Sequence, residues 1–295
     1  MTARLGPLDI AMGLAVALIW GLGVVFAKAA IEHFPPILLM TLRFAVTAVA
    51  TVWFVKPPLG QLRQLCFIAL FAAAIQYSLT FTGLIGLDAG VAGLVIQLEV
   101  PFLVLLGALF LGETPGLRKW IGIALAFLGI GLIVGEPKVG GAWVSVLLVM
   151  GGAFTWAVGQ AMVRGLKDID GRTVTAWIAV FAVPQLLVMS LIFESDHLAA
   201  IQGASWTVWS AVLYLGLVMT ALGYGFWYSL VRRHPVSLVA PFLLLLPVVT
   251  AVGGIVFLGE ELTPTILLGG AVVIGGVGFI LIERPAPVAE AGAEP

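Results

Sequence analysis

The chain has 295 residues, of which 61% are hydrophobic and only 10% are charged, and its formal net charge is −1. An average soluble domain carries about 25% charged residues, so this composition excludes a water-soluble surface. The charge and the lack of a basic cluster also exclude a nucleic-acid-binding protein. Apolar runs of roughly 20 residues recur along the chain, and an α-helix of that length crosses the hydrocarbon of a bilayer. The sequence therefore predicts a multi-pass membrane protein.

The apolar runs predict helices, because they are apolar on every side, whereas a membrane barrel strand alternates in polarity. Polar residues, prolines and glycines divide the chain into ten predicted spans. These are 8–31, 36–55, 63–86, 89–111, 118–135, 142–165, 172–193, 207–230, 236–258 and 264–283. The end of the chain, 284–295, has no apolar periodicity and is predicted to be a disordered cytoplasmic tail.

The lysines and arginines predict the orientation of the chain. With the N-terminus inside, eleven of those near helix ends face the cytoplasm, and only Lys28 and Lys138 face the other side. Basic residues near helix ends are retained on the cytoplasmic side. We therefore predict that both termini lie inside. Arg43 falls within the second predicted span and does not enter this comparison.

The tetrapeptide FLGE occurs twice, at 110–113 and at 257–260, which indicates an internal repeat. A repeat of five spans is inverted in the membrane because five is odd, and inverted repeats are typical of secondary transporters. The sequence predicts two five-helix repeats, 8–135 and 142–283. At a shift of 147 residues the repeats pair Tyr77 with Tyr224 and Glu113 with Glu260, and nearer the N-terminus a shift of 136 pairs Trp20 with Trp156 and Lys28 with Arg164.

Several segments in this order resemble the EamA-domain transporters of the drug/metabolite transporter superfamily, in particular bacterial amino-acid exporters. They are ALIWGLGVVFAKAA, PPILLMTLRF, the two FLGE, FTWAVGQAMV, YGFW and LLLLPVV. The resemblance implies ten helices, a central cavity and efflux of amino acids or related metabolites without ATP. It also implies a multi-pass protein of the bacterial inner membrane. Glu99, in VIQLEVPF, stands where those exporters are expected to have a neutral polar residue.

Two tryptophans lie near the middle of their spans, although membrane tryptophans usually gather at the interfaces. Trp20 and Trp156 occupy matched positions in the two repeats, which favours a role in lining the cavity over packing between helices. Gln160 lies four residues after Trp156, on the same helix face, and could donate a hydrogen bond to a substrate.

Glu99 lies about 15 Å below the start of its span, close to the bilayer midplane. A charge at this depth costs about 3 kcal/mol on insertion scales, so the carboxylate must be protonated, paired or exposed to water. It could hold a substrate amine, take part in proton coupling, or form a structural pair with Arg43. Arg43 in turn could reach the interface by snorkelling, or hold a substrate carboxylate.

The paired Tyr77 and Tyr224 are predicted to lie toward opposite sides of the membrane, where they would line the two ends of one pathway. The alternative is a hydroxyl that bonds a carbonyl of a neighbouring helix. Gln76, beside Tyr77, is a weaker candidate for the same pathway.

No HExxH, Walker or GxSxG pattern occurs, and the three histidines lie in separate predicted loops, so the sequence predicts no metal, cofactor or catalytic residue. The spacing Gly131-x-x-x-Gly135 allows close helix packing and leaves a monomer or a homodimer open. The leading function is export of amino acids or related metabolites by alternating access. Export of hydrophobic drugs or nucleotide-linked sugars is the alternative, and an intramembrane enzyme the third.

Overall fold

The computed structural model describes residues 5–110, 113–166, 169–234 and 236–282, so the predicted tail lies outside the described residues. Within these ranges the secondary structure is entirely helical, and ten helical segments are long and apolar enough to cross a membrane. The all-α membrane fold and the ten predicted spans are thus confirmed, and the bounds agree within a few residues. The segments are Pro7–Ala30, Pro36–Phe54, Leu59–Leu84, Ala89–Phe110, Leu117–Val134, Trp143–Val163, Gly171–Phe193, Trp206–Arg233, Ala240–Leu258 and Pro264–Leu281.

Five of these segments precede residue 136. They comprise α1 (Pro7–Ala30), α2 (Pro36–Thr51) with the 3-10 turn η1 (Val52–Phe54), η2 (Leu59–Gln61) with α3 (Leu62–Ala69), the π-helix η3 (Leu70–Ile75) and α4 (Gln76–Leu84), then α5 (Ala89–Ile96) with α6 (Glu99–Phe110), and finally α7 (Leu117–Val134).

The other five segments follow the short helix α8 (Pro137–Gly140). The first two are α9 (Trp143–Val163) and α10 (Gly171–Phe193), and the short helix α11 (His197–Gly203) follows them. The eighth segment consists of α12 (Trp206–Leu213), the π-helix η4 (Tyr214–Leu222) and α13 (Gly223–Arg233). After α14 (Val236–Val239), the ninth segment consists of the 3-10 segment η5 (Ala240–Leu245), α15 (Leu246–Gly253) and the π-helix η6 (Gly254–Leu258), and the tenth is α16 (Pro264–Leu281).

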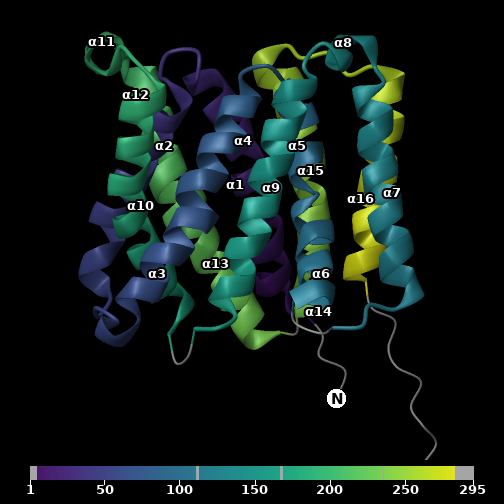
Figure 1. The fold of residues 1–295 in the computed structure, drawn as a ribbon, viewed down its shortest axis with the longest axis horizontal. Coiled ribbons are helices and arrows are strands. Elements are labelled where there is room, and N and C mark those ends of the chain that lie inside the picture. Colours follow the sequence, from purple (N-terminus) through teal and green to yellow (C-terminus); the bar gives the residue numbers. More distant parts are fainter. Residues whose placement is uncertain (1–4, 111–112, 167–168, 235, 283–295) are drawn as a thin grey trace, which may run out of the picture.

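The helices stand side by side, roughly parallel to a common axis, in one bundle (Figure 1). We call the end with the start of α1 and with α14 the lower face, and the end with α8 and α11 the upper face. The predicted orientation would place the lower face in the cytoplasm. Large apolar side chains point outward from the bundle, and Trp53, Trp143 and Trp206 are exposed at the ends of their helices. This is the distribution expected of a surface that contacts lipid, with aromatic residues at the interfaces.

The fourth and ninth membrane segments are interrupted, which the apolar pattern did not predict. The helix breaks between Ile96 and Glu99, where Pro101 cannot donate to the carbonyl of Gln97 and its ring crowds that carbonyl. In the ninth segment a 3-10 stretch precedes α15, which begins at Leu246, 147 residues after Glu99. Irregular backbone inside a membrane is tolerated only where it is buried in protein or lines a cavity. The two breaks therefore mark the interior where a site can form.

Helices α7 and α16 pack backbone against backbone (Figure 1). A Cβ atom on Gly122 would lie 2.6 Å from the carbonyl oxygen of Gly276, and one on Gly129 would lie 2.6 Å from that of Gly269. Small residues permit such close approach in membrane helices. The bounds of α7 and α16 are themselves 147 residues apart, as are the starts of α4 and α13.

Candidate functional site

Arg43, in the middle of α2, is completely buried. Its Nε donates a hydrogen bond to Thr220 Oγ1 at 3.0 Å, and its Nη2 donates one to the Tyr77 hydroxyl at 3.3 Å. The guanidinium carbon also lies 4.6 Å from the centroid of the Tyr77 ring. Among the described residues no carboxylate forms an ion pair with Arg43. The guanidinium is thus held by two hydroxyls and an aromatic face, which orient it without neutralising its charge.

The π-helix η4 fixes the position of Arg43. The Thr220 hydroxyl donates to the carbonyl of Leu215, five residues earlier, at 2.8 Å. One turn below Arg43, Thr47 Oγ1 donates to the carbonyl of Gly216 at 2.9 Å. A Cβ atom on Gly216 would lie 2.9 Å from the Arg43 carbonyl oxygen, so α2 and η4 are in close contact. Wide π-turns inside α-helices are frequent at functional sites.

Tyr224, in α13, connects Arg43 to the other predicted residues. Its ring lies 5.0 Å from that of Trp20, measured between centroids. Its hydroxyl is close enough to Tyr77, Arg43 and Glu99 to interact with them electrostatically. Tyr224 thus lies against Trp20, in α1, and within electrostatic range of three other residues that the sequence singled out, in α2, α4 and α6. We call these five residues the cluster around Arg43.

Glu99 is the first residue of α6, directly after the break in the fourth segment. Its side chain is half-buried and makes no ion pair or hydrogen bond with any described residue. The structural pair with Arg43, one of the predicted alternatives, is not formed. Two buried amides are also incompletely satisfied, because Gln97 Nε2, two residues before Glu99, and Gln76 Oε1, in α4, have no partner. Such atoms indicate polar groups that await a ligand or water.

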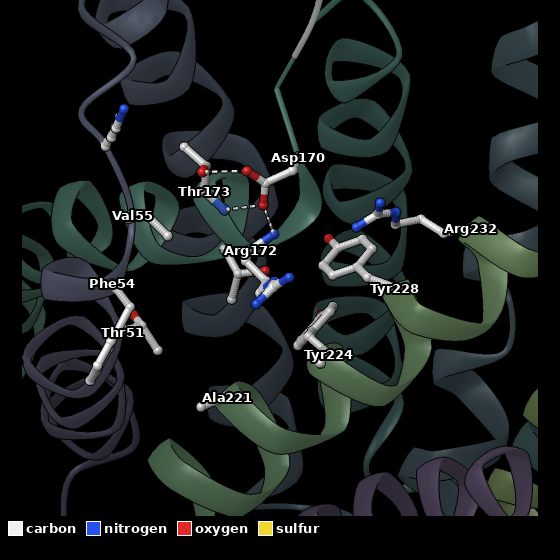
Figure 2. Close-up of a pocket in the computed structure, with 13 residues that line it drawn as sticks. Thr51, Phe54, Val55, Asp170, Arg172, Thr173, Ala221, Tyr224, Tyr228 and Arg232 are labelled. Carbon is white, nitrogen blue, oxygen red and sulfur yellow. Dashed lines mark hydrogen bonds between the residues drawn. The ribbon is translucent and has the colours of Figure 1, made fainter. Parts of the chain in front are cut away.

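A cavity of about 610 Å³ lies at the lower-face ends of α2, α10 and α13. Figure 2 shows Tyr224 and Tyr228 from α13 on one side, with Asp170 and Arg172 from the start of α10 on the other. Tyr224 belongs both to this cavity and to the cluster around Arg43. Through Tyr224, the wall of the cavity lies within electrostatic range of the buried guanidinium.

The mouth of the cavity is positively charged. Lys56, Arg172 and Arg232 line it together with a single carboxylate, that of Asp170. This carboxylate caps α10, since it accepts bonds from the backbone N–H groups of Arg172 and Thr173 and from the Thr173 hydroxyl. Partial burial raises the pKa of Asp170, but these hydrogen bonds outweigh it and lower the pKa below its usual value. Asp170 is thus an anion that is already engaged at neutral pH.

Trp20, Trp156 and Gln160 were also predicted to line a cavity or contact a substrate, and none of the three lines this cavity. Trp156 and Gln160 are half-buried in α9, and neither lines the cavity. Trp20 lies in the cluster, but its indole N–H is engaged by the carbonyl of Met219 at 3.1 Å. Trp20 can therefore contribute a wall and no free donor. Thr220 and the cavity-lining residues Lys56, Asp170, Arg172, Tyr228 and Arg232 were not predicted as site residues. The hydroxyl of Thr220 within an apolar run was the signal that could have found the first of these.

Ten membrane helices with interrupted spans and a buried arginine are the architecture of a multi-pass membrane transporter. The profile of the EamA-like transporter family matches residues 8–135 and again 143–282. The chain belongs to this family, which confirms the resemblance noted in the sequence.

Curated relatives include two named probable amino-acid metabolite efflux pump. The one from Salmonella typhimurium is 33% identical, with 90% of this chain and 92% of the relative covered. The one from Escherichia coli is 31% identical, with 91% and 93% covered. A probable terminal-alkyne amino-acid exporter from Streptantibioticus cattleyicolor is 33% identical over 77% of each chain. A crystal structure of a protein with 20% identity superposes with a TM-score of 0.61 over 92% of this chain and 95% of its own, which supports the fold alone.

Proposed function

We propose that this protein exports amino acids or related small metabolites across a bacterial inner membrane, by alternating access to the cluster around Arg43. The observation that carries the proposal is the completely buried guanidinium of Arg43, which no described carboxylate neutralises. Ionised groups inside a membrane protein are costly and mark substrate or ion pathways. A substrate carboxylate would complete the site, because a guanidinium binds carboxylates through two parallel hydrogen bonds.

Glu99 would take the amino group of the same substrate. Both Arg43 and Glu99 lie within electrostatic range of Tyr224, so a substrate that packs against this tyrosine could interact with both charges. An α-amino acid carries both charges a short distance apart, which matches such a site. Trp20, Tyr77 and Tyr224 would form its apolar walls, as aromatic rings do in most small-molecule sites. The unpaired carboxylate could also carry a proton when the amine is absent, which would couple transport to a pH gradient.

The basic mouth favours this substrate class over hydrophobic drugs, many of which are cations. Three cationic side chains attract a carboxylate and repel a ligand of net positive charge, and the engaged carboxylate of Asp170 offsets only one of them. Lysines and arginines on a cytoplasmic face also satisfy the orientation rule. Their grouping around a cavity that Tyr224 lines together with them supports a role in substrate entry.

The two matches of the family profile and the 147-residue spacing of α4 with α13 and of α7 with α16 support two inverted repeats. The contacts of α7 with α16 have the corresponding symmetry. Gly122 faces Gly276, which is the repeat partner of Gly129, and Gly129 faces Gly269, which is the repeat partner of Gly122. A two-fold axis in the membrane plane relates such contacts. This symmetry is what alternating access between two exchangeable halves requires.

The test is counterflow in proteoliposomes with radiolabelled amino acids, in competition with three unlabelled analogues. Amino acids with both charges should compete, whereas the carboxyl amide and the N-acetyl derivative should each compete at least about tenfold less well, because each lacks one charged partner. A hydrophobic cation should not compete. Equal competition by the amide and by the free amino acid would contradict the role of Arg43, and transport of the cation alone would favour the drug exporter.

A further inference from the structure

On the upper face, a glutamate from the second half of the chain caps the start of a helix in the first half. The Glu260 carboxylate accepts hydrogen bonds from the backbone N–H groups of Ala89 and Gly90, at the start of α5. Lys28, in α1, lies within electrostatic range of Glu260. Its ammonium group nevertheless donates to the carbonyls of Leu84 and Ile85, at 2.8 and 3.0 Å. Glu260 therefore caps a membrane segment while a lysine beside it is engaged elsewhere.

The lower face holds the equivalent carboxylate in a different arrangement. Glu113 Oε1 pairs with Arg164 Nη1 at 3.0 Å, and both side chains are half-exposed. The backbone N–H groups of the two glutamates make equivalent hydrogen bonds. The N–H of Glu113 donates to the carbonyl of Gly107 at 3.1 Å, and the N–H of Glu260 donates to that of Gly254, also at 3.1 Å.

The repeat relates all four charged residues. Glu113 pairs with Glu260 at a shift of 147 residues, and Arg164 pairs with Lys28 at a shift of 136. One molecule thus shows the same glutamate and basic residue in two arrangements. On the upper face the glutamate caps a broken membrane segment, and on the lower face it binds the basic residue. The cavity lies on the face where the glutamate binds the basic residue.

We propose that Glu260 and Glu113 are latches that exchange partners during transport. When the protein opens to the upper face, Glu260 leaves Ala89 and Gly90 and pairs with Lys28, while Glu113 leaves Arg164 and closes the lower face. This inference rests on the proposed inverted repeat and alternating access, but it does not depend on which substrate is carried.

The chemistry makes such an exchange inexpensive. A carboxylate receives charge-assisted hydrogen bonds both at a helix N-terminus and from a basic side chain, so it has a partner in either state. The two arrangements differ in exposure to water. The pair of Glu113 with Arg164 is half-exposed and contributes little, whereas the caps of Glu260 on Ala89 and Gly90 are partly buried. The capped arrangement therefore contributes more to the state in which it occurs.

The test uses neutral variants of the two latches and a reporter of the lower cavity. In a protein with Cys66→Ser, a cysteine is introduced at Ala221, which lines the cavity, and its rate of labelling by a water-soluble maleimide is measured in proteoliposomes made permeable to the reagent. Glu260→Gln should slow labelling several-fold, because it weakens closure of the upper face. Glu113→Gln should accelerate labelling, or leave the rate unchanged if the parent protein already labels at the maximal rate. The double variant should return toward the parent rate.

A static helix cap predicts a different pattern. Loss of thermal stability in Glu260→Gln with an unchanged labelling rate would overturn the proposal, and so would slower labelling in both single variants. Glu261→Gln, at the neighbouring position, is the matched control and should leave the rate unchanged.

A second experiment does not require the neutral variants to fold normally. Cysteines replace Lys28 and Glu260 together, and a disulfide between them should form faster when substrate drives turnover. The oxidised protein should then label slowly at position 221. Fast labelling after complete cross-linking would contradict the exchange. Both experiments report conformation, so a failure of the latch is distinguished from a wrong substrate assignment by the counterflow assay.

Discussion

The guanidinium of Arg43 makes both a hydrogen bond and a cation–π contact with the phenol of Tyr77. Nη2 donates to the hydroxyl at 3.3 Å, and the guanidinium carbon lies 4.6 Å from the ring centroid. The tyrosine thus orients the guanidinium and stabilises its charge without neutralising it. A residue oriented in this way can bind a carboxylate with little reorganisation, which is a condition for tight and selective recognition.

The first prediction concerns the shape of the cation at position 43. Arg43→Lys keeps the charge but cannot donate to Thr220 and bind a carboxylate bidentately at the same time, so kcat/KM for amino-acid transport should fall by about 10- to 100-fold. Arg43→Gln should reduce transport further. Initial rates in proteoliposomes provide the measurement. Arg118→Gln, on the same predicted side and outside the cavity, is the control and should transport normally. Equal activity of all three variants would exclude Arg43 from the site.

The second prediction concerns Glu99. Glu99→Gln should fold normally, because no described residue depends on this carboxylate for an ion pair. It should lose any dependence of transport on a pH gradient and bind substrates with a free amine about tenfold more weakly. Exchange of substrate across the membrane without net proton movement should survive. Unchanged affinity together with unchanged pH dependence would remove both proposed roles of Glu99.

The third prediction concerns close packing of α7 on α16. A larger side chain at Gly129 would collide with the backbone of Gly269, so Gly129→Leu should lower the free energy of unfolding by about 1–3 kcal/mol or more. Gly131→Leu is the matched control, because a Cβ atom at Gly131 has no neighbour within 4 Å. Thermal unfolding in detergent measures both. Similar losses in the two variants would indicate an effect of helix propensity or lipid contact instead.

The fourth prediction concerns the cap of α10. The folded protein lowers the pKa of Asp170 below its ordinary value of 3.8, so the cap contributes fully above that value and is lost as pH falls through the folded pKa. Asp170→Ala should cost about 0.5–2 kcal/mol of stability at pH 7. The difference from the unmodified protein should shrink below about pH 3.8. A difference that stays constant across that range would mean that the carboxylate does not act as a charged cap.

Much of the fold could be predicted from the sequence, because twenty apolar residues have few alternatives to a membrane helix. The cluster was only partly accessible. Arg43, Glu99 and Tyr224 stood out because charged or polar groups are rare inside apolar runs. Thr220, one of the two hydroxyl partners of Arg43, did not stand out. Its position opposite Arg43 depends on a π-helix, which the periodicity of the sequence does not reveal. Trp156 matches Trp20 in sequence, but neither lines the cavity, and it is Trp20 whose ring lies against Tyr224.

The contact of α7 with α16 has a consequence for the origin of the chain. Under the proposed repeat, the contact of Gly122 with Gly276 is equivalent to the contact of Gly129 with Gly269, so equivalent segments of the two halves lie on both sides. A half-length ancestor with five helices could make this contact with a second copy of itself inserted in the opposite orientation. Duplication and fusion of its gene would then fix the two orientations in one polypeptide. Each half could afterwards diverge, which would allow Glu99 to appear in one half while its counterpart at position 246 is a leucine.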